Sequence, residues 1–205
     1  MIDTDGARLG ARAARDLAAS GQCEIGPGMT ERELCRVEQE YGFEFADDHR
    51  AFLAAGLPVN TPIPEQEGVI HAYARPWPDW RDGAPEELRR RLAWPVEGVL
   101  FDVEHNAFWD QDWGARPDEP AEALHIAAQR LATVPRMVPI YGHRFLPGGH
   151  GTYGHPVLSM YQTDIIYYGA DLADYIHREF GGRGVVQEGA LQQAHATVPF
   201  WRDFL

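Results

Sequence analysis

The chain has 205 residues, enough for one domain, and its 31 acidic against 18 basic residues give a net charge of −13 at pH 7. This excess of acid repels nucleic acids and anionic membranes and favours basic partners. We therefore expect the protein to bind neither nucleic acid nor membrane. Because no segment approaches the roughly 20 apolar residues of a membrane span, we also expect a soluble, cytoplasmic protein.

The first 56 residues predict three helices. A short Ala-rich helix at 5–20 has few large apolar residues, so we expect it to pack weakly or to fray. After the Gly-containing linker at 21–28, Thr30 and Glu33 form the pattern of a capping box. The helix that follows is expected to end at Gly42. Asp47 is the predicted N-cap of the third helix, which Gly56 ends.

Residues 57–84 are rich in proline and predict irregular structure, with a short strand at 69–74. Pro85 occupies the position of a first helical residue, so 85–93 is predicted as a helix. The stretch "GVLFDVE" at 98–104 alternates as a strand does, with Phe101 on one face and Asp102 and Glu104 on the other. Pro120 begins another helix, which ends before Pro135.

The last third predicts strands at 137–141, 143–146, 156–161 and 164–168, followed by a helix that Asp171 caps. Short turns between consecutive strands favour antiparallel pairing, so the fold class is α+β, mostly an antiparallel sheet with helices packed around it. The expected division is an N-terminal extension at 1–28, the α+β domain at 29–180 and a tail at 181–205 whose aromatic end folds back. We expect the core to include Leu34, Val37, Phe52, Leu88, Phe101, Ile140 and Ile176.

The run at 141–169 gathers three histidines and five tyrosines around the Gly-rich loop 148–155. A zinc site needs three or four converging ligands, and neither an HExxH nor a paired CxxC pattern is present. We therefore predict a β-hairpin with packed tyrosines, no metal, no cofactor and no catalytic residue. A small hydrolase that uses His143, Asp164 and the 148–155 loop remains the alternative.

The run at 101–122 combines seven acidic residues and one basic residue with the interleaved aromatic residues Phe108, Trp109 and Trp113. One interpretation is a solvated face whose aromatic residues point into the core. The other is a partner-binding surface, because tryptophan supplies contact area and carboxylates steer a basic partner. The predicted partner-binding residues are Asp102, Glu104, Trp109, Asp110, Asp112 and Trp113.

Several stretches resemble the SUKH superfamily, in its Smi/Knr-type branch. They are "ERELCRVEQEYGFEFADDHRAFLAAGLP", "GVLFDVEHNAFW", "VPRMVPIYGHRFLPGG" and "PVLSMYQTDIIYYGADLADYIHREF". The resemblance rests on Glu33, Tyr41, Phe52, Leu53, Gly56, Pro139, Gly142 and Tyr168. The chain departs from the pattern at Ala46, where the family usually has proline, and in the 57–97 insertion.

The resemblance implies an α+β fold without catalytic activity. Many bacterial members are similar to immunity proteins, which bind and neutralise a toxin, often a nuclease or a deaminase. We therefore expect a non-enzymatic protein that binds a basic protein toxin. A cytoplasmic interaction scaffold without a toxin partner is a further alternative, and the sequence leaves the toxin and the oligomeric state open.

Overall fold

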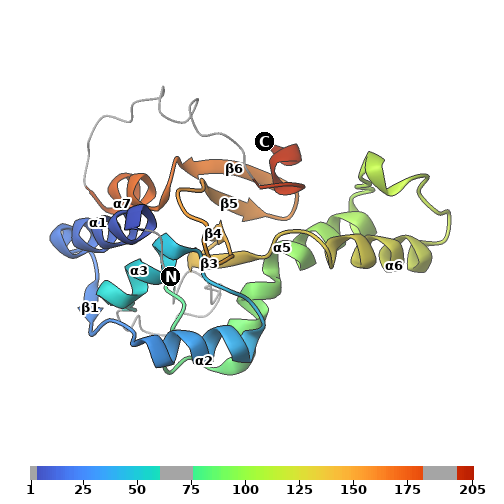
Figure 1. Ribbon diagram of the computed structural model, residues 1–205. Coiled ribbons are helices and arrows are strands. Elements are labelled where there is room, and N and C mark those ends of the chain that lie inside the picture. The colour runs from blue at the N-terminus through green and yellow to red at the C-terminus, as the bar shows by residue number, and fades with distance from the viewer. Residues whose placement is uncertain (1–3, 61–75, 182–197) are drawn as a thin grey trace, which may run out of the picture.

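The computed structural model describes residues 4–60, 76–181 and 198–205. Its centre is a four-stranded antiparallel sheet with helices around it, so the predicted α+β class is confirmed (Figure 1). The strand predicted at 69–74 lies outside the described residues.

The sheet has the order β3-β4-β5-β6, so each strand pairs with its neighbour in sequence. The strands are β3 (Met137–Tyr141), β4 (Arg144–Pro147), β5 (Val157–Tyr161) and β6 (Asp164–Gly169). Phe145 lies opposite Leu158, and Leu158 lies opposite Tyr167. The predicted strand positions in this segment are confirmed. Short turns join β3 to β4 and β5 to β6, and the alternation of apolar residues favours this register.

The sheet separates two core clusters, since successive side chains of a strand point to opposite faces. Val138, Leu146 and Val157 belong to the first core cluster, which packs α1 (Thr4–Ser20), α2 (Glu31–Tyr41), α3 (Asp47–Ala55) and α7 (Leu172–Phe180). Phe145 and Leu158 belong to the second core cluster, which packs α6 (Pro120–Leu131) and the 3-10 helix η2 (Trp201–Phe204). The helix α5 (Pro85–His105) contributes to both clusters.

The expectation that the N-terminal helix packs weakly is wrong. Ala13 and Leu17 of α1 are fully buried, and α1 packs against α3 and α7. A Cβ on Gly10 would lie 2.0 Å from the backbone oxygen of Asp48, so the two helices approach very closely there. Small residues thus let α1 pack closely against α3 without large apolar side chains.

The predicted helix ends are largely confirmed. The hydroxyl of Thr30 accepts from the Glu33 N–H, and the Glu33 carboxylate accepts from the Thr30 N–H. Gly42 ends α2 in the left-handed conformation, with φ of 66°. Asp47 was predicted as the N-cap of α3, which is wrong: Ala46 is the N-cap, and Asp47 is the first helical residue. Two short strands pair with each other: β1 (Glu24–Gly26) lies where a linker was predicted, and β2 (Leu57–Val59) lies where irregular structure was predicted.

The strand predicted at 98–104 is wrong, because α5 continues unbroken to His105. Pro95 and Gly98 favour a break in the helix, and the alternation of apolar and polar residues at 98–104 is typical of a strand. The buried residues of α5 instead recur at helical spacing across the whole segment: Leu88, Leu92, Pro95, Val99 and Val103. Six of the seven predicted core residues are buried, whereas Phe101 is 44% exposed because the helical phase turns it outward.

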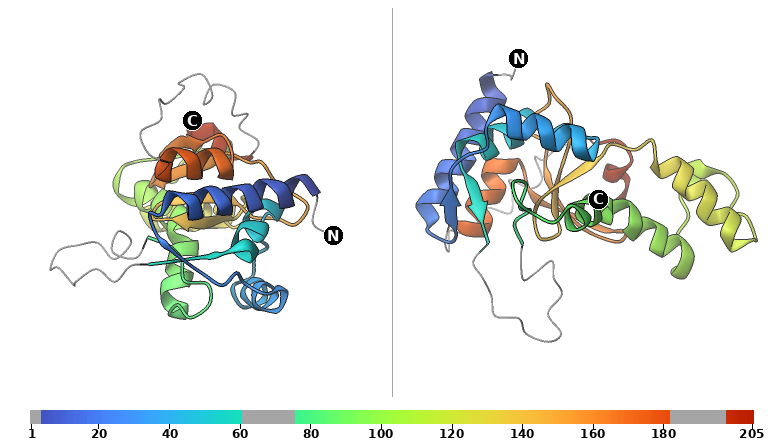
Figure 2. Two further views of the ribbon diagram at one scale, coloured as in Figure 1. Left: turned by 90° about the vertical axis from the view of Figure 1, so that its left-hand side faces the viewer. Right: turned by 90° about the horizontal axis from the view of Figure 1, so that it is seen from below.

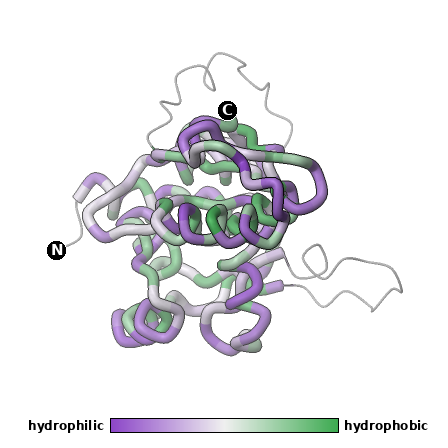
Figure 3. The backbone as a smooth tube through the Cα atoms, turned by 90° about the vertical axis from the view of Figure 1, so that its right-hand side faces the viewer, coloured by the Kyte–Doolittle hydropathy of each residue, from purple (hydrophilic) through white to green (hydrophobic). Residues whose placement is uncertain are grey.

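The second half of α5 and the antiparallel α6 form an arm that projects beyond the sheet (Figures 1 and 2). The connection between them contains the short 3-10 helix η1 (Gln111–Trp113). Figure 3 views the molecule from the side of the arm, where hydrophilic and hydrophobic segments alternate along the helices. Val198 and Trp201 are buried in the second core cluster, so the predicted return of the C-terminal end is confirmed.

Candidate functional site

The arm presents a group of exposed carboxylates. Five of the seven acids in 101–122 are exposed, and they are Glu104, Asp112, Asp118, Glu119 and Glu122. Asp110 is partly exposed, and the single basic residue of the run, Arg116, donates to the backbone oxygen of Val103 at 2.7 Å. The projecting carboxylates therefore produce a negative potential that the arm itself leaves largely uncompensated.

Asp102 does not belong to this exposed set, because it is only 3% exposed. Its carboxylate accepts from the Thr163 N–H at 2.9 Å, the Thr163 hydroxyl at 2.6 Å and the Asn106 amide at 2.6 Å. Burial alone would raise the pKa of Asp102, but these hydrogen bonds bring it below its ordinary value. The prediction of Asp102 as an outward-facing carboxylate is wrong, because it assumed a strand at 98–104, and this segment is helical.

The two tryptophans of the run lie in different environments. Trp113 is buried, and its ring stacks on Phe200 with centroids 6.2 Å apart. Trp109 is partly exposed; its indole N–H donates to the Gly114 oxygen at 2.7 Å, and Arg116 lies 5.9 Å from its ring centroid. Trp113 therefore follows the core interpretation, whereas Trp109 stays accessible to a partner.

Asp110 has a local structural role in addition to its charge. Its carboxylate accepts from the Asp112 N–H at 2.8 Å and so caps η1. Asp112 itself remains exposed on the far side of that turn. Of the six predicted partner-binding residues, Glu104, Trp109, Asp110 and Asp112 therefore stay on the surface of the arm.

A second surface feature, which the sequence did not indicate, lies where α5 meets the turn between β5 and β6. The Trp94 indole donates to the Met160 oxygen at 3.3 Å, and its ring lies 6.2 Å from that of Tyr161. A Cβ on Gly98 would come within 2.9 Å of the Gln162 backbone. The turn is thus held along one stripe of α5, with Tyr161 left 50% exposed beside it.

Phe101 is the most exposed large apolar residue of α5. Its ring stacks on the imidazole of His105, with centroids 4.2 Å apart and planes 14° apart. His105 is itself exposed, and its Nδ1 lies 3.7 Å from the Glu104 carboxylate. An aromatic face and a carboxylate therefore lie side by side on the outer surface of this helix.

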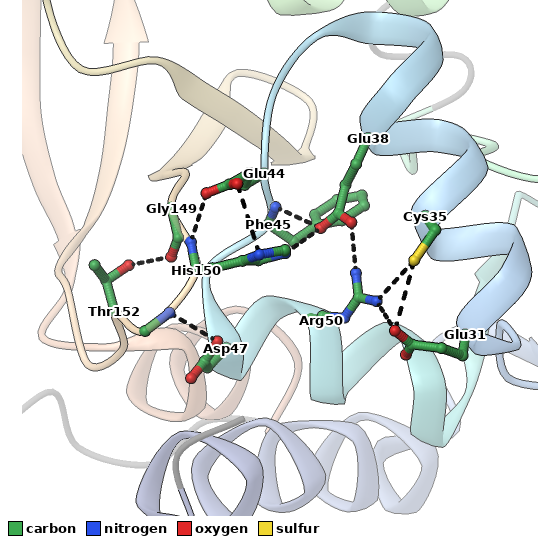
Figure 4. A network of polar contacts seen from close by, with 11 residues as sticks. Glu31, Cys35, Glu38, Glu44, Phe45, Asp47, Arg50, Gly149, His150 and Thr152 are labelled. Carbon is green, nitrogen blue, oxygen red and sulfur yellow. Dashed lines mark hydrogen bonds and ion pairs between the residues drawn. The ribbon is translucent and has the colours of Figure 1, made fainter. Parts of the chain in front are cut away.

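A network of charged residues, centred on the buried Arg50 and Glu38, joins α2, α3 and the loop after β4 (Figure 4). Arg50 forms ion pairs with Glu31 and, at 2.7 Å, with the buried Glu38. The hydrogen bond from Arg50 lowers the pKa of Glu31. Glu38 also accepts from the Phe45 N–H at 3.0 Å and lies 3.0 Å from His150 Nε2. Sequence reasoning missed this network, whose sole signal was a charged residue on the apolar side of each helix.

The Gly-rich loop 148–155 is held by carboxylates of the helical layer. The His150 N–H donates to Glu44 at 3.2 Å, and the Gly151 N–H donates to Asp47 at 3.1 Å. The Gly154 N–H donates to Asp48 at 2.9 Å. Each of these contacts fixes the loop against α3 and the residues before it, which gives the loop a structural function.

The predicted catalytic alternative distributes its residues over different places. His150 lies beside Glu38 and Glu44, whereas Asp164 is exposed at the start of β6 and follows Thr163, which donates to Asp102 of α5. His143 is partly buried in the turn before β4, and burial, with a further effect of Arg144, lowers its pKa. The structure thus brings His150 to Glu38 and Glu44 and not to Asp164.

Across residues 4–60, 76–181 and 198–205, no group of three or more His, Cys, Asp or Glu side chains is arranged to hold a metal ion. None of the helices in the described part of the chain is both long enough and apolar enough to span a membrane. Neither a protein family, nor a curated protein, nor a solved structure matches the chain.

Proposed function

We propose that this protein is a non-enzymatic binding protein that captures a basic protein, and that the acidic arm attracts this partner. The observation that carries the proposal is the projection of five exposed carboxylates on α5, α6 and their connection. Charges that extend away from a protein body attract an opposite charge during encounter and raise the association rate.

The nature of the partner follows from charge and from the sequence resemblance. A net charge of −13 favours a cationic surface. The resemblance to SUKH-type immunity proteins supports a toxin as that partner, of the nuclease or deaminase class, since such enzymes carry basic substrate grooves. An acidic arm that enters such a groove would neutralise the toxin by occupying it.

The hydrolase alternative has less support. The polar groups of the 148–155 loop contact Glu44, Asp47 and Asp48, and these contacts favour a structural function for the loop. Asp164 lies at the start of β6 rather than beside His150. The binding proposal uses the exposed residues of the arm and needs no catalytic group.

The test begins with the reading frames that flank the gene. We expect the product of one of them to be basic, to inhibit growth when expressed alone, and to be tolerated when expressed with this protein. Association of the two purified proteins should slow as salt is added, because screening weakens the attraction between exposed charges.

The arm is then tested by neutralising Asp112, Asp118, Glu119 and Glu122 to Asn or Gln. The control neutralises four exposed acids elsewhere: Glu24, Glu40, Asp82 and Glu179. We expect the arm variant to associate at least ten-fold more slowly at low salt and the control variant to change far less. Equal effects of the two variants, or none, would refute the arm as the attracting surface.

A further inference from the structure

Among the described residues, the three most exposed large apolar side chains lie on α5 or on the two strands joined by the turn that α5 holds. Phe101 is 44% exposed, Tyr161 is 50% exposed and Ile166 is 51% exposed. Single exposed apolar residues are ordinary, but a group of them marks an interaction surface. We call these three residues the aromatic patch.

Contacts between α5 and the turn at 162–163 hold the elements that carry the aromatic patch against each other. Tyr161 lies beside Trp94, and Trp94 precedes Phe101 by two helical turns on the same side of α5. Ile166 follows Asp164, which lies opposite Tyr161, on the same face of the sheet. Asp102 and Gly98 hold the turn against the helix, so the patch is presented by packed elements.

Exposed carboxylates border the aromatic patch. Glu97 precedes Phe101 by one helical turn, and Glu104 lies three residues after it. Asp164 borders Tyr161 in the neighbouring strand. This combination disfavours a second copy of the chain as the occupant, because two bodies of charge −13 repel each other.

We propose that the aromatic patch is an arginine-recognition surface, on which the basic partner docks an exposed arginine side chain. A guanidinium group is planar, stacks on aromatic rings and forms two parallel hydrogen bonds with a carboxylate. His105 covers one face of the Phe101 ring, so the guanidinium would stack on the opposite face, and Glu97 or Glu104 offers the carboxylate. This inference rests on the proposed function and names the contact that holds the partner after the arm has attracted it.

The division of labour has a kinetic consequence. Charges on the arm act during encounter and set the association rate, whereas an anchoring ring acts after contact and sets the dissociation rate. Mutations in the arm and in the aromatic patch should therefore change different rate constants. Lysine carries the same charge as arginine but lacks the planar group, so it distinguishes recognition from simple attraction.

The experiment uses fluorescently labelled nona-arginine and nona-lysine peptides as probes, with the full chain. Rates and affinities are measured at two salt concentrations for the wild type, Phe101→Ala, Phe101→Leu, Tyr161→Ala and the arm variant. Phe101→Leu retains apolar area and removes the aromatic face. Tyr153→Ala is the control, because Tyr153 is 39% exposed in the loop at the other end of β5.

We expect the wild type to bind nona-arginine more tightly than nona-lysine. Both Phe101 variants should weaken nona-arginine binding by about two- to five-fold through faster dissociation, and they should leave nona-lysine binding unchanged. Tyr153→Ala should have no effect on either peptide. Unaltered melting temperatures of the variants show that the fold is intact.

Two contrary outcomes are separable. If the arm variant slows association but the two peptides bind equally and Phe101→Ala matches the wild type, the arginine-recognition surface is refuted and the proposed function stands. If the arm variant also matches the wild type at both salt concentrations, the attraction by the arm is refuted as well.

Discussion

His49 shows how strongly burial controls a single ionisable residue in this protein. Its imidazole is 1% exposed and lies between the rings of Phe45 and Phe52. Its Nδ1 has no hydrogen-bond partner among the described residues. Burial lowers the pKa of His49 to about 3, so the folded protein keeps this side chain neutral under mildly acidic conditions.

Acid should therefore destabilise the fold through His49. Below pH 6.5 the unfolded chain binds a proton at this residue and the folded chain does not. The free energy of unfolding therefore decreases as the pH is lowered. At pH 5 the loss is on the order of 2 kcal/mol relative to pH 8. Asp48 acts in the opposite direction, because burial raises its pKa to about 6 and the folded state then binds protons more tightly.

The measurement isolates His49 by comparison with His49→Gln. Urea unfolding is followed at pH 8 and at pH 5, and the contribution of Asp48 is common to both proteins. We expect the advantage of the wild type to shrink by about 2 kcal/mol on acidification. Parallel pH profiles of the two proteins would show that His49 does not stay neutral in the folded state.

At the scale of elements, α5 determines where the accessible groups of the arm lie. One stripe of this helix holds the turn between β5 and β6, and Asp102 supplies the polar part of that contact. The neighbouring stripe turns Phe101 and Glu104 to solvent. The same helix thus provides an anchoring face and a free face.

We predict that Asp102→Ala lowers the free energy of unfolding by about 3 kcal/mol, because hydrogen bonds to a buried charge are lost together. Glu104→Ala is the matched control, two residues away on the exposed face, and should change stability by about 0.5 kcal/mol or less. Urea unfolding measures both. Similar effects of the two substitutions would contradict the burial of Asp102.

The elements predicted correctly are those whose signals are local. Thr30 and Glu33 fix the start of α2 through neighbouring backbone groups, and short turns fix the pairing of β3 with β4 and of β5 with β6. The second half of α5 could not be recognised from "GVLFDVE" alone, because Val99 and Val103 satisfy both periodicities. Only the continuation of the apolar stripe from Leu88 through Pro95 distinguishes the helix, and Pro95 itself favours the opposite interpretation.

The candidate site was predicted in part for the same reason. The acids at 110–122 lie in a connection and in the first turn of α6, where no periodicity decides exposure, and most of them are exposed as expected. Asp102 is buried and Phe101 is exposed, the reverse of the prediction, because a helix turns these side chains in other directions than a strand does. The burial of Trp113 depends on Phe200 and Trp201, which are far away in sequence. Contacts over such separations are not encoded in a local pattern.

At the scale of the molecule, the C-terminal residues complete the second core cluster. Trp201 is fully buried, and its indole donates to the Pro135 oxygen at 2.7 Å. Phe204 contacts Phe108, and Phe200 contacts Trp113, both in the connection between α5 and α6. The end of the chain therefore supports the orientation of the arm relative to the sheet.

We predict that Trp201→Ala lowers the free energy of unfolding by about 3–5 kcal/mol, the usual cost of removing a buried aromatic side chain. Leu205→Ala, at an exposed position in the same segment, is the control and should be nearly neutral. Thermal unfolding measures both. A small effect of Trp201→Ala would mean that the C-terminal segment packs only weakly on the second core cluster.

The continuity of α5 across both core clusters determines how cooperatively the protein unfolds. Leu88 and Leu92 lie on one side of the sheet layer, and Val99 and Val103 lie on the other, within one hydrogen-bonded helix. Separate melting of the two sides would require this helix to break at its middle. Amide protons along the buried stripe of α5 should therefore exchange with solvent together, at a rate set by global unfolding, so that both halves act as one cooperative unit.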